Sequence, residues 1–406
     1  MSRASRSAAH LLVAASLALA GCLGGGEETD PQARGKVVTV HASLPRHGVS
    51  AAAARAVEDG ARLALADAGG RAGGLPVRLI VHSSTTADER VWDPALVSRN
   101  AELAADDPSA VGYLGELDYG ASAVSLPITN EARMLQVSPA DGLTSLTRTP
   151  PGRPRSNPER LRPAAQRSFV RLTPSDLLQA EAILKLARAD GASRLALVFD
   201  DGVYGRELAA QLVARARREG PEPVRDEEYR GEPADVPGIA AELVDARPNA
   251  VVYAGVSGPG TGPLMAAIDA RMPGVPLYAT GGALARDPGR PIPAAPDRVR
   301  AVTSVLPPTA LPAPARRIVS RVAARDGATV ARPEAVYGYE AMRLVLDAVA
   351  EGGRDRERVI DAALRTRRSA SALGPLRLTR TGDVTERRFA VYDLADGSFE
   401  FDRIVR

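Results

Sequence analysis

The chain has 406 residues, of which 45% are hydrophobic and 25% are charged, a balance typical of a soluble globular protein. Its 52 basic residues barely exceed its 49 acidic ones and are scattered along the chain, so no nucleic-acid partner is expected. The single cysteine excludes an internal disulfide, and the length predicts about two or three domains.

The first segment has the pattern of a secretory signal peptide. Arg3 and Arg6 precede an apolar stretch, Leu11–Ala20, and small residues then lead to Cys22. The apolar stretch is too short to remain as a membrane span, which needs about 20 apolar residues.

The tetrapeptide LAGC at 19–22 matches the bacterial lipobox. That resemblance implies cleavage before Cys22 and lipidation of its thiol. We therefore expect a lipoprotein signal peptide at 1–21, a flexible Gly/Glu-rich tether at 22–35, and attachment to the membrane surface through Cys22. A plain secretory signal with a chance cysteine is the alternative.

Short β-branched runs then alternate with Ala/Leu-rich amphipathic segments. Strands are expected at 37–42, 77–81, 110–114, 134–137, 169–172, 195–199, 223–229, 250–254, 277–280 and 299–305. Helices are expected at 51–68, 93–105, 122–131, 175–190, 204–218, 236–245, 262–272, 314–326, 333–352 and 355–366. The alternation predicts an α/β fold of two doubly wound lobes, each a parallel sheet covered by helices, with a cleft between them.

One stretch breaks this rhythm. Residues 143–166 are rich in Pro and Arg without a period, which predicts an exposed loop near a domain crossover. The sequence TPSD at 173–176 then predicts a helix start with Thr173 as its N-cap.

The sequence lacks the reagents of an enzyme. His41, His47 and His82 fit no metal-binding motif, and neither a nucleophile elbow nor a nucleotide-binding P-loop occurs. We therefore predict no catalytic residues, no metal and no cofactor.

Several stretches in order, together with the lipobox, resemble the type I periplasmic solute-binding proteins, specifically the branched-chain amino-acid group of ABC-transporter receptors. The stretches are 106–140, 169–176, 194–205, 334–349 and 372–384.

The resemblance implies two lobes joined by a hinge, with lobe 1 at 36–166 and 306–373 and lobe 2 at 167–305 and 374–406. A small polar solute, an amino acid or a related compound, would bind between the closing lobes without turnover. The closed form, a monomer outside the cytoplasm, would then be recognised by the membrane permease of an ABC importer.

Candidate ligand-binding residues lie where predicted strands end. They are Leu117, Asp118, Tyr119, Gly120, Ala121, Ser122, Ser138, Ala140 and Asp141 in lobe 1 and Tyr204, Ser257 and Gly281 in lobe 2. The amides of the loop at 115–122 and the following helix dipole would suit a ligand carboxylate, with the Ser122 hydroxyl near. Tyr204 matches a family tyrosine that faces the ligand, although a structural role is the alternative.

The site departs from the family pattern. Tyr119 and Gly142 stand where serine or threonine is common, and glycines at 281–282 replace the acid that usually binds the ligand ammonium. An aromatic residue of the family is also missing around Ser257. The amino-acid clamp is therefore incomplete.

The first-lobe loop carries two acidic residues of its own. Glu116 and Asp118 could bind an amine from that wall, or they could form a solvated loop face.

Two other functions stay open. A sensor of the same fold could feed a receptor or kinase, and a secreted lipoprotein enzyme would need a catalytic dyad that the sequence does not show.

Overall fold

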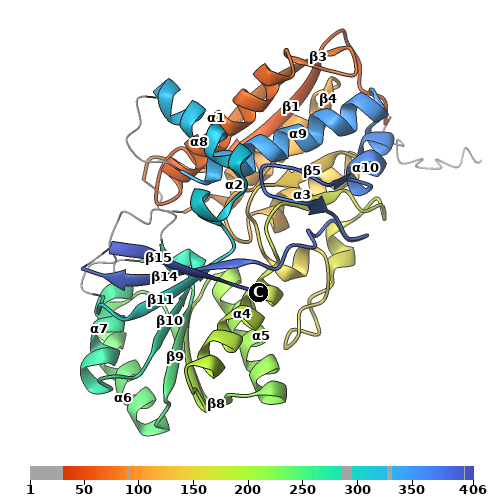
Figure 1. Cartoon of the computed structure of the whole chain (residues 1–406). Helices are drawn as coiled ribbons and strands as arrows, with labels where there is room; N and C mark the ends of the chain where they lie inside the picture. The colour runs from red at the N-terminus through yellow and green to blue at the C-terminus, as the bar shows by residue number, and fades with distance from the viewer. Residues whose placement is uncertain (1–30, 89–90, 259, 285–294, 327–331, 397) are drawn as a thin grey trace, which may run out of the picture.

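The structure, a computed structural model, has two α/β lobes, each built on its own sheet (Figure 1). It describes residues 31–88, 91–258, 260–284, 295–326, 332–396 and 398–406. The expected signal peptide, Cys22 and most of the tether lie outside the described residues. The predicted fold class is confirmed.

The first sheet has six strands in the order β2-β3-β1-β4-β5-β6. Their bounds are β1 (Val38–Leu44), β2 (Arg71–Ala72), β3 (Leu75–Ser83), β4 (Ala110–Leu114), β5 (Leu135–Ser138) and β6 (Phe169–Arg171). All neighbours pair in parallel except β2, which pairs antiparallel with β3. Every residue of β1 and β4 is buried, because helices cover both faces of the sheet.

The helices of the first lobe come from two distant parts of the chain. They are α1 (Ala51–Asp67), α2 (Pro94–Asp106), α3 (Ser122–Glu131), α8 (Ala313–Asp326), α9 (Glu334–Gly352) and α10 (Arg356–Leu364). Helices α1 and α9 pack closely because Gly60 and Gly338 lie at their contact. A Cβ on either glycine would collide with the backbone of the other helix.

The second sheet has seven strands in the order β15-β14-β11-β10-β9-β7-β8. Their bounds are β7 (Arg194–Asp200), β8 (Glu222–Tyr229), β9 (Ala250–Ala254), β10 (Leu277–Thr280), β11 (Val299–Thr303), β14 (Phe389–Ala395) and β15 (Ser398–Val405). The antiparallel hairpin β14–β15, which joins the parallel strands beside β11, was not anticipated from the sequence.

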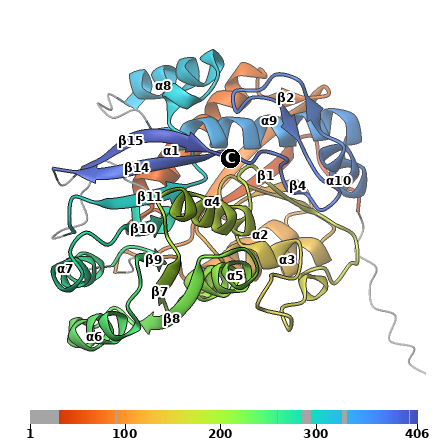
Figure 2. The ribbon, with the colours of Figure 1, turned by 60° about the horizontal axis from the view of Figure 1, so that its bottom comes forward.

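Four helices cover the second sheet. They are α4 (Asp176–Ala189), α5 (Val203–Glu219), α6 (Val236–Ala246) and α7 (Thr261–Arg271). Helices α4 and α5 lie on one side of the sheet and α6 and α7 on the other (Figure 2). This sandwich exposes the loops at the strand ends, where ligands bind in such folds.

Strand pairing bears on the expected lobe boundaries at two places. Strand β6 pairs with β5, so the first sheet extends past the boundary expected at residue 166. The small pair β12 (Arg367–Arg368) and β13 (Leu376–Arg377) spans the boundary expected at residue 373. The expected lobe boundaries stay a prediction, and the β5–β6 pairing favours a crossover after β6.

The loop expected to be exposed at 143–166 begins inside the protein. Leu143 and Leu146 pack in a core cluster with Leu126 and Phe169, because a 3-10 turn folds this part of the loop inward. The helix start is also corrected: α4 begins at Asp176 with Ser175 at the N-cap position, so Thr173 is not its cap.

Candidate functional site

A loop of lobe 1 meets a helix of lobe 2 through a pair of tyrosines. Tyr119 follows β4 in lobe 1, and Tyr204 lies in the first turn of α5 in lobe 2. Their rings stack with centroids 4.1 Å apart and planes 18° apart. The Tyr204 hydroxyl donates to Oε1 of Gln179 at 3.0 Å, and this hydrogen bond orients the Tyr204 ring. The two tyrosines therefore close the cleft between the lobes.

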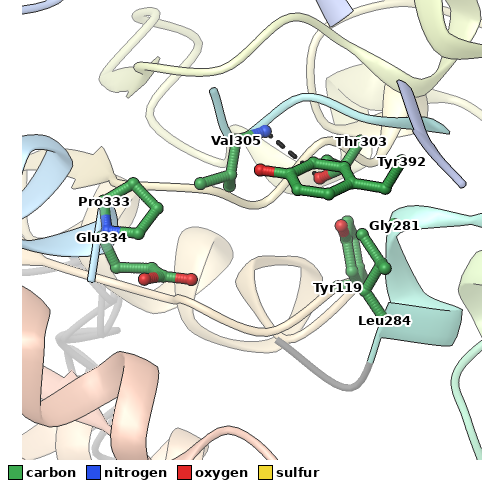
Figure 3. Close-up of a pocket in the computed structure, with 8 residues that line it drawn as sticks. All are labelled: Tyr119, Gly281, Leu284, Thr303, Val305, Pro333, Glu334 and Tyr392. Atoms are coloured by element: carbon green, nitrogen blue, oxygen red, sulfur yellow. Dashed lines mark hydrogen bonds between the residues drawn. The ribbon is translucent and has the colours of Figure 1, made fainter. Parts of the chain in front are cut away.

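Two small cavities remain beside this stack, and Tyr119 lines both. Each has a volume of about 30 Å³, room for about one or two water molecules. The first is lined by Tyr119, Gly281, Leu284, Thr303, Val305, Pro333, Glu334 and Tyr392 (Figure 3). The second is lined by Val49, Ser50, Val91, Trp92, Asp118, Tyr119, Val256 and Gly282. A solute larger than water can enter only if the lobes part or Tyr119 turns aside.

The first cavity combines a carboxylate with two phenols. Glu334 begins α9 in lobe 1 and is buried, and its carboxylate faces the side of the cavity that holds Tyr119 and Tyr392 (Figure 3). Burial and the charge of Glu334 together raise the pKa of Tyr392. The Thr303 hydroxyl oxygen accepts from the amide of Val305 at 3.2 Å, which shapes the remaining wall.

The second cavity also contains a carboxylate. Asp118 is 8% exposed, and its Oδ1 accepts a hydrogen bond from the Ser50 hydroxyl at 2.5 Å. Trp92 and Val256 add apolar surface from the two lobes. The described lining of each cavity therefore combines a carboxylate with apolar surface.

The N-terminus of α3, where a ligand carboxylate was expected, already holds a carboxylate of the protein. Oδ1 of Asp141 accepts from the amides of Gly120 at 3.1 Å and Leu143 at 3.2 Å. Its Oδ2 accepts from the amide of Ser122 at 3.0 Å. Asp141 is fully buried and lines neither cavity. Its charge satisfies the helix dipole from inside lobe 1.

Several other predicted residues lie beneath this loop rather than in the cavities. The Ser122 hydroxyl oxygen accepts from the amide of Glu116 at 3.2 Å. The Ser138 hydroxyl donates to the carbonyl of Glu116 at 2.7 Å. Leu117, Ala121 and Ala140 are buried. These residues hold the loop in shape.

Glu116 faces the interior of lobe 1 and not the cleft. The Tyr113 hydroxyl donates to its Oε1 at 2.7 Å, and burial raises the pKa of Glu116 to about 8. Of the two loop acids considered as amine partners, only Asp118 lines a cavity.

The remaining predicted residues lie at the second-lobe wall. Gly281 lines the first cavity, and a Cβ there would lie 3.0 Å from the Tyr119 hydroxyl. Gly120 of lobe 1 lies next to Val203 of lobe 2, because a Cβ on Gly120 would lie 3.5 Å from the Cβ of Val203. Ser257 is half-buried; its amide donates to the carbonyl of Gly282 at 2.9 Å, and it lines neither cavity.

Sequence reasoning missed Glu334, Tyr392 and Trp92. Glu334 stands at the start of a stretch already noted for its resemblance, and Trp92 is the only tryptophan of the chain. Tyr392 lies in β14, a strand that was not predicted. The apolar residues around it in the sequence were the one signal that could have indicated this strand.

His41 and His82 line neither cavity. Nδ1 of His41 lies 3.0 Å from Nε2 of His82, and its Nε2 lies 2.9 Å from Oδ2 of Asp107. Within the described ranges, no group of three or more His, Cys, Asp or Glu residues is placed to hold a metal ion. None of the described helices is long and apolar enough to cross a membrane.

Two doubly wound lobes that meet over a small lined cleft define a two-lobed binding protein. A family profile for periplasmic binding proteins matches residues 38–398. The chain therefore belongs to the periplasmic binding protein family, whose members bind substrates and are not enzymes.

Solved structures show the same fold at low identity. A leucine-binding protein from Thermotoga maritima is 20% identical, with a TM-score of 0.73 over 91% of this chain and 99% of that one. A solute-binding protein from R. palustris in complex with benzoate is 19% identical, with a TM-score of 0.68 over 91% and 96%. A branched-chain amino-acid binding protein from Streptococcus pneumoniae in complex with isoleucine is 15% identical, with a TM-score of 0.71 over 91% and 99%. No curated protein sequence matches the chain.

Proposed function

We propose that this chain is the extracytoplasmic solute-binding lipoprotein of an ABC importer. It captures a small polar solute, an amino acid or a related compound, between its two lobes. The observation that carries the proposal is the contact of Tyr119 with Tyr204, because it joins the loop after β4 in lobe 1 to the start of α5 in lobe 2 beside two lined cavities. The solved relatives that hold leucine, isoleucine or benzoate support a solute of this size.

Capture works by a shift between open and closed states. The open form exposes the tyrosines and the cavity walls, and a solute that contacts both lobes favours the closed form. Asp118, Tyr119, Tyr204 and Gly281 are the predicted residues that we propose to touch the solute directly. The shift can be no larger than the difference in solute affinity between the two states.

Attachment to the membrane and delivery to a permease rest on the sequence. The LAGC motif supports lipidation of Cys22, which would keep a monomer at the membrane surface. Mass spectrometry of the chain purified from a bacterial host tests this directly. We expect a diacylglycerol adduct that is absent from the Cys22→Ser variant.

A thermal-shift screen of the full chain in mild detergent tests solute binding. The panel holds amino acids, amides, amines and small carboxylates. A solute at 100 times its dissociation constant stabilises the folded state by about 2.7 kcal/mol, a clear rise in melting temperature. A panel with no active member, or turnover of an active one, contradicts the proposal.

A further inference from the structure

A groove on lobe 1 lies outside the cleft, where α8 and α9 face the loop between β12 and β13. Its volume is about 390 Å³, against about 30 Å³ for each cavity beside Tyr119. Pockets that hold small molecules commonly have volumes of about 300–1,000 Å³. We call this feature the α8 groove and define it by Arg317 and Arg321 of α8, Tyr339 and Glu340 of α9, and the loop at 370–372. Its described lining shares no residue with the two cavities of the cleft.

Hydrogen bonds to Asp67 fix the distance between α8 and α9 along the groove. Asp67 is the last residue of α1, and both terminal nitrogens of Arg321 donate to its carboxylate, at 2.6 and 2.8 Å. The Tyr339 hydroxyl donates to Oδ2 of the same carboxylate at 3.1 Å. The charge of Arg321 is therefore paired within the protein, and the groove is a preformed feature of lobe 1.

The acidic residue of the groove, Glu340, is paired as well. It is 4% exposed, and its Oε2 accepts from a terminal nitrogen of Arg368 at 2.8 Å. Its Oε1 accepts from the amide of Ala372 at 2.6 Å, which attaches the loop at 370–372 to α9. The negative charge in the lining is therefore satisfied by the protein.

Arg317 differs from these residues. It lies one helical turn before Arg321 on the same face of α8, and it is exposed. Among the residues that the structure describes, its side chain has neither a hydrogen-bond partner nor an ion-pair partner. Its guanidinium presents donors in a planar fork that matches the two oxygens of a carboxylate. The groove therefore offers one unpaired positive charge to a ligand.

The rest of the groove suits an apolar body. Pro314, Ile318, Ala370 and Ala372 contribute apolar surface, and Tyr339 contributes an aromatic ring. An apolar cavity of about 150 Å³ can hold benzene, so the α8 groove has room for a six-membered ring and a charged group beside it.

We infer that the α8 groove is a second ligand site, which binds a small carboxylate with an apolar body. The carboxylate receives two hydrogen bonds from Arg317, and the apolar body lies against Pro314 and Ala370. Since α8 and α9 both belong to lobe 1, a ligand binds here without closure of the lobes.

Calorimetric titration of the full chain in mild detergent tests the inference with three matched probes. Phenylacetate and phenylacetamide have the same skeleton and differ in charge, whereas acetate keeps the charge and lacks the ring. Phenylacetate should bind about tenfold tighter than phenylacetamide, as one bidentate contact to a charged group predicts. It should also bind tighter than acetate, and its affinity should fall as NaCl is raised.

Variants of α8 locate the contact. Arg317→Gln should weaken phenylacetate binding about tenfold and leave phenylacetamide binding unchanged. Arg317→Lys keeps the charge without the planar fork, so its affinity for phenylacetate should lie between the two. Arg325→Gln is the matched control, because Arg325 is exposed on the same helix and does not line the groove. Melting temperatures report folding, and Arg317→Lys gives the same comparison should Arg317→Gln fail to fold.

The outcomes separate the groove from the cleft. Equal phenylacetate affinity in Arg317→Gln and Arg325→Gln overturns the groove assignment, because the probe then binds elsewhere, and it leaves the proposed function intact. Phenylacetamide binding as tight as that of phenylacetate, or no phenylacetate binding at all, overturns the inference too. Two binding events in the unaltered chain, of which Arg317→Gln loses one, support a groove site beside the cleft.

Discussion

The ring of Tyr119 lies flat against the ring of Tyr204, 4.1 Å between centroids, and so joins a loop of lobe 1 to a helix of lobe 2. Tyr204 is 2% exposed and donates a hydrogen bond to Gln179, whereas Tyr119 lies in the loop between β4 and α3 and lines both cavities. We therefore expect a solute to displace the ring of Tyr119 and not that of Tyr204.

Removing the Tyr119 ring should open the cleft in the absence of solute. A stacked aromatic pair contributes about 0.5–1.5 kcal/mol beyond its buried area, so Tyr119→Ala should shift the protein toward the open state. Trp92, the only tryptophan, lines the adjoining cavity and reports the change. We expect its emission to move to longer wavelength in Tyr119→Ala and to stay in place in Tyr119→Phe. Identical emission from both variants would mean that the stack does not hold the lobes together.

Asp141 should be a structural anchor of the first-lobe loop. Asp141→Ala leaves three buried amides without their acceptor, and we expect a loss of about 2–4 kcal/mol in the free energy of unfolding. Asp141→Asn, which keeps one amide oxygen, should lose less. Urea denaturation measures both.

The same variant tests whether Asp141 fills an anion site. Added sodium acetate should raise the melting temperature of Asp141→Ala more than that of the unaltered chain, because the amides at α3 become available. Equal responses to acetate would show that the loop collapses instead of offering the site.

Much of the fold follows from local pattern. The strand at 110–114, the helix at 122–131 and the strands at 250–254 and 277–280 have the predicted bounds, because periodic apolar residues and clear breakers mark them. The hairpin β14–β15 was not predicted. Strand β14 is apolar and mostly buried, but its partner β15 is mostly exposed and carries charged residues, so the second half of the hairpin lacks the apolar pattern of the central strands.

Less of the site than of the fold could be predicted from the sequence. The strand-end rule selected Tyr119, Tyr204 and Gly281, and these residues lie where the two lobes meet; their contact with a solute stays a prediction. It could not show that Asp141 turns inward to its own loop amides, since this depends on how two strand ends meet. Glu334 reaches the cleft only because α9 packs back on the first sheet, a tertiary event without a local signal.

Glu116 should make stability depend on pH. Burial raises its pKa from 4.5 to about 8, so the folded state binds more protons than the unfolded state between these values. The contribution of Glu116 to the free energy of unfolding is therefore fully present below pH 4.5 and is lost as the pH rises toward 8. Denaturation of the unaltered chain and of Glu116→Gln across this range should show the fall only in the former. If the unfolding free energies of the two proteins changed with pH in the same way, Glu116 would not be the group responsible.

Asp383 should be essential to the segments that join the lobes. Its Oδ1 lies 2.8 Å from Nε of Arg171, the fully buried last residue of β6, and its Oδ2 accepts from Arg148 at 3.0 Å. Asp383→Asn leaves Arg171 without its counter-charge, and we expect a loss of about 3–5 kcal/mol in unfolding free energy. Asp396→Asn, at an exposed turn, is the control and should lose little. Similar losses of unfolding free energy in both variants would show that Asp383 is not the essential counter-charge of Arg171.

Lobe closure on a bound solute is tested most directly by small-angle X-ray scattering of the full chain in mild detergent, with and without a saturating solute from the thermal-shift panel. The account predicts a smaller radius of gyration with the solute, because contacts to both lobes favour the closed state. Superimposable scattering curves with a solute that raises the melting temperature would contradict it.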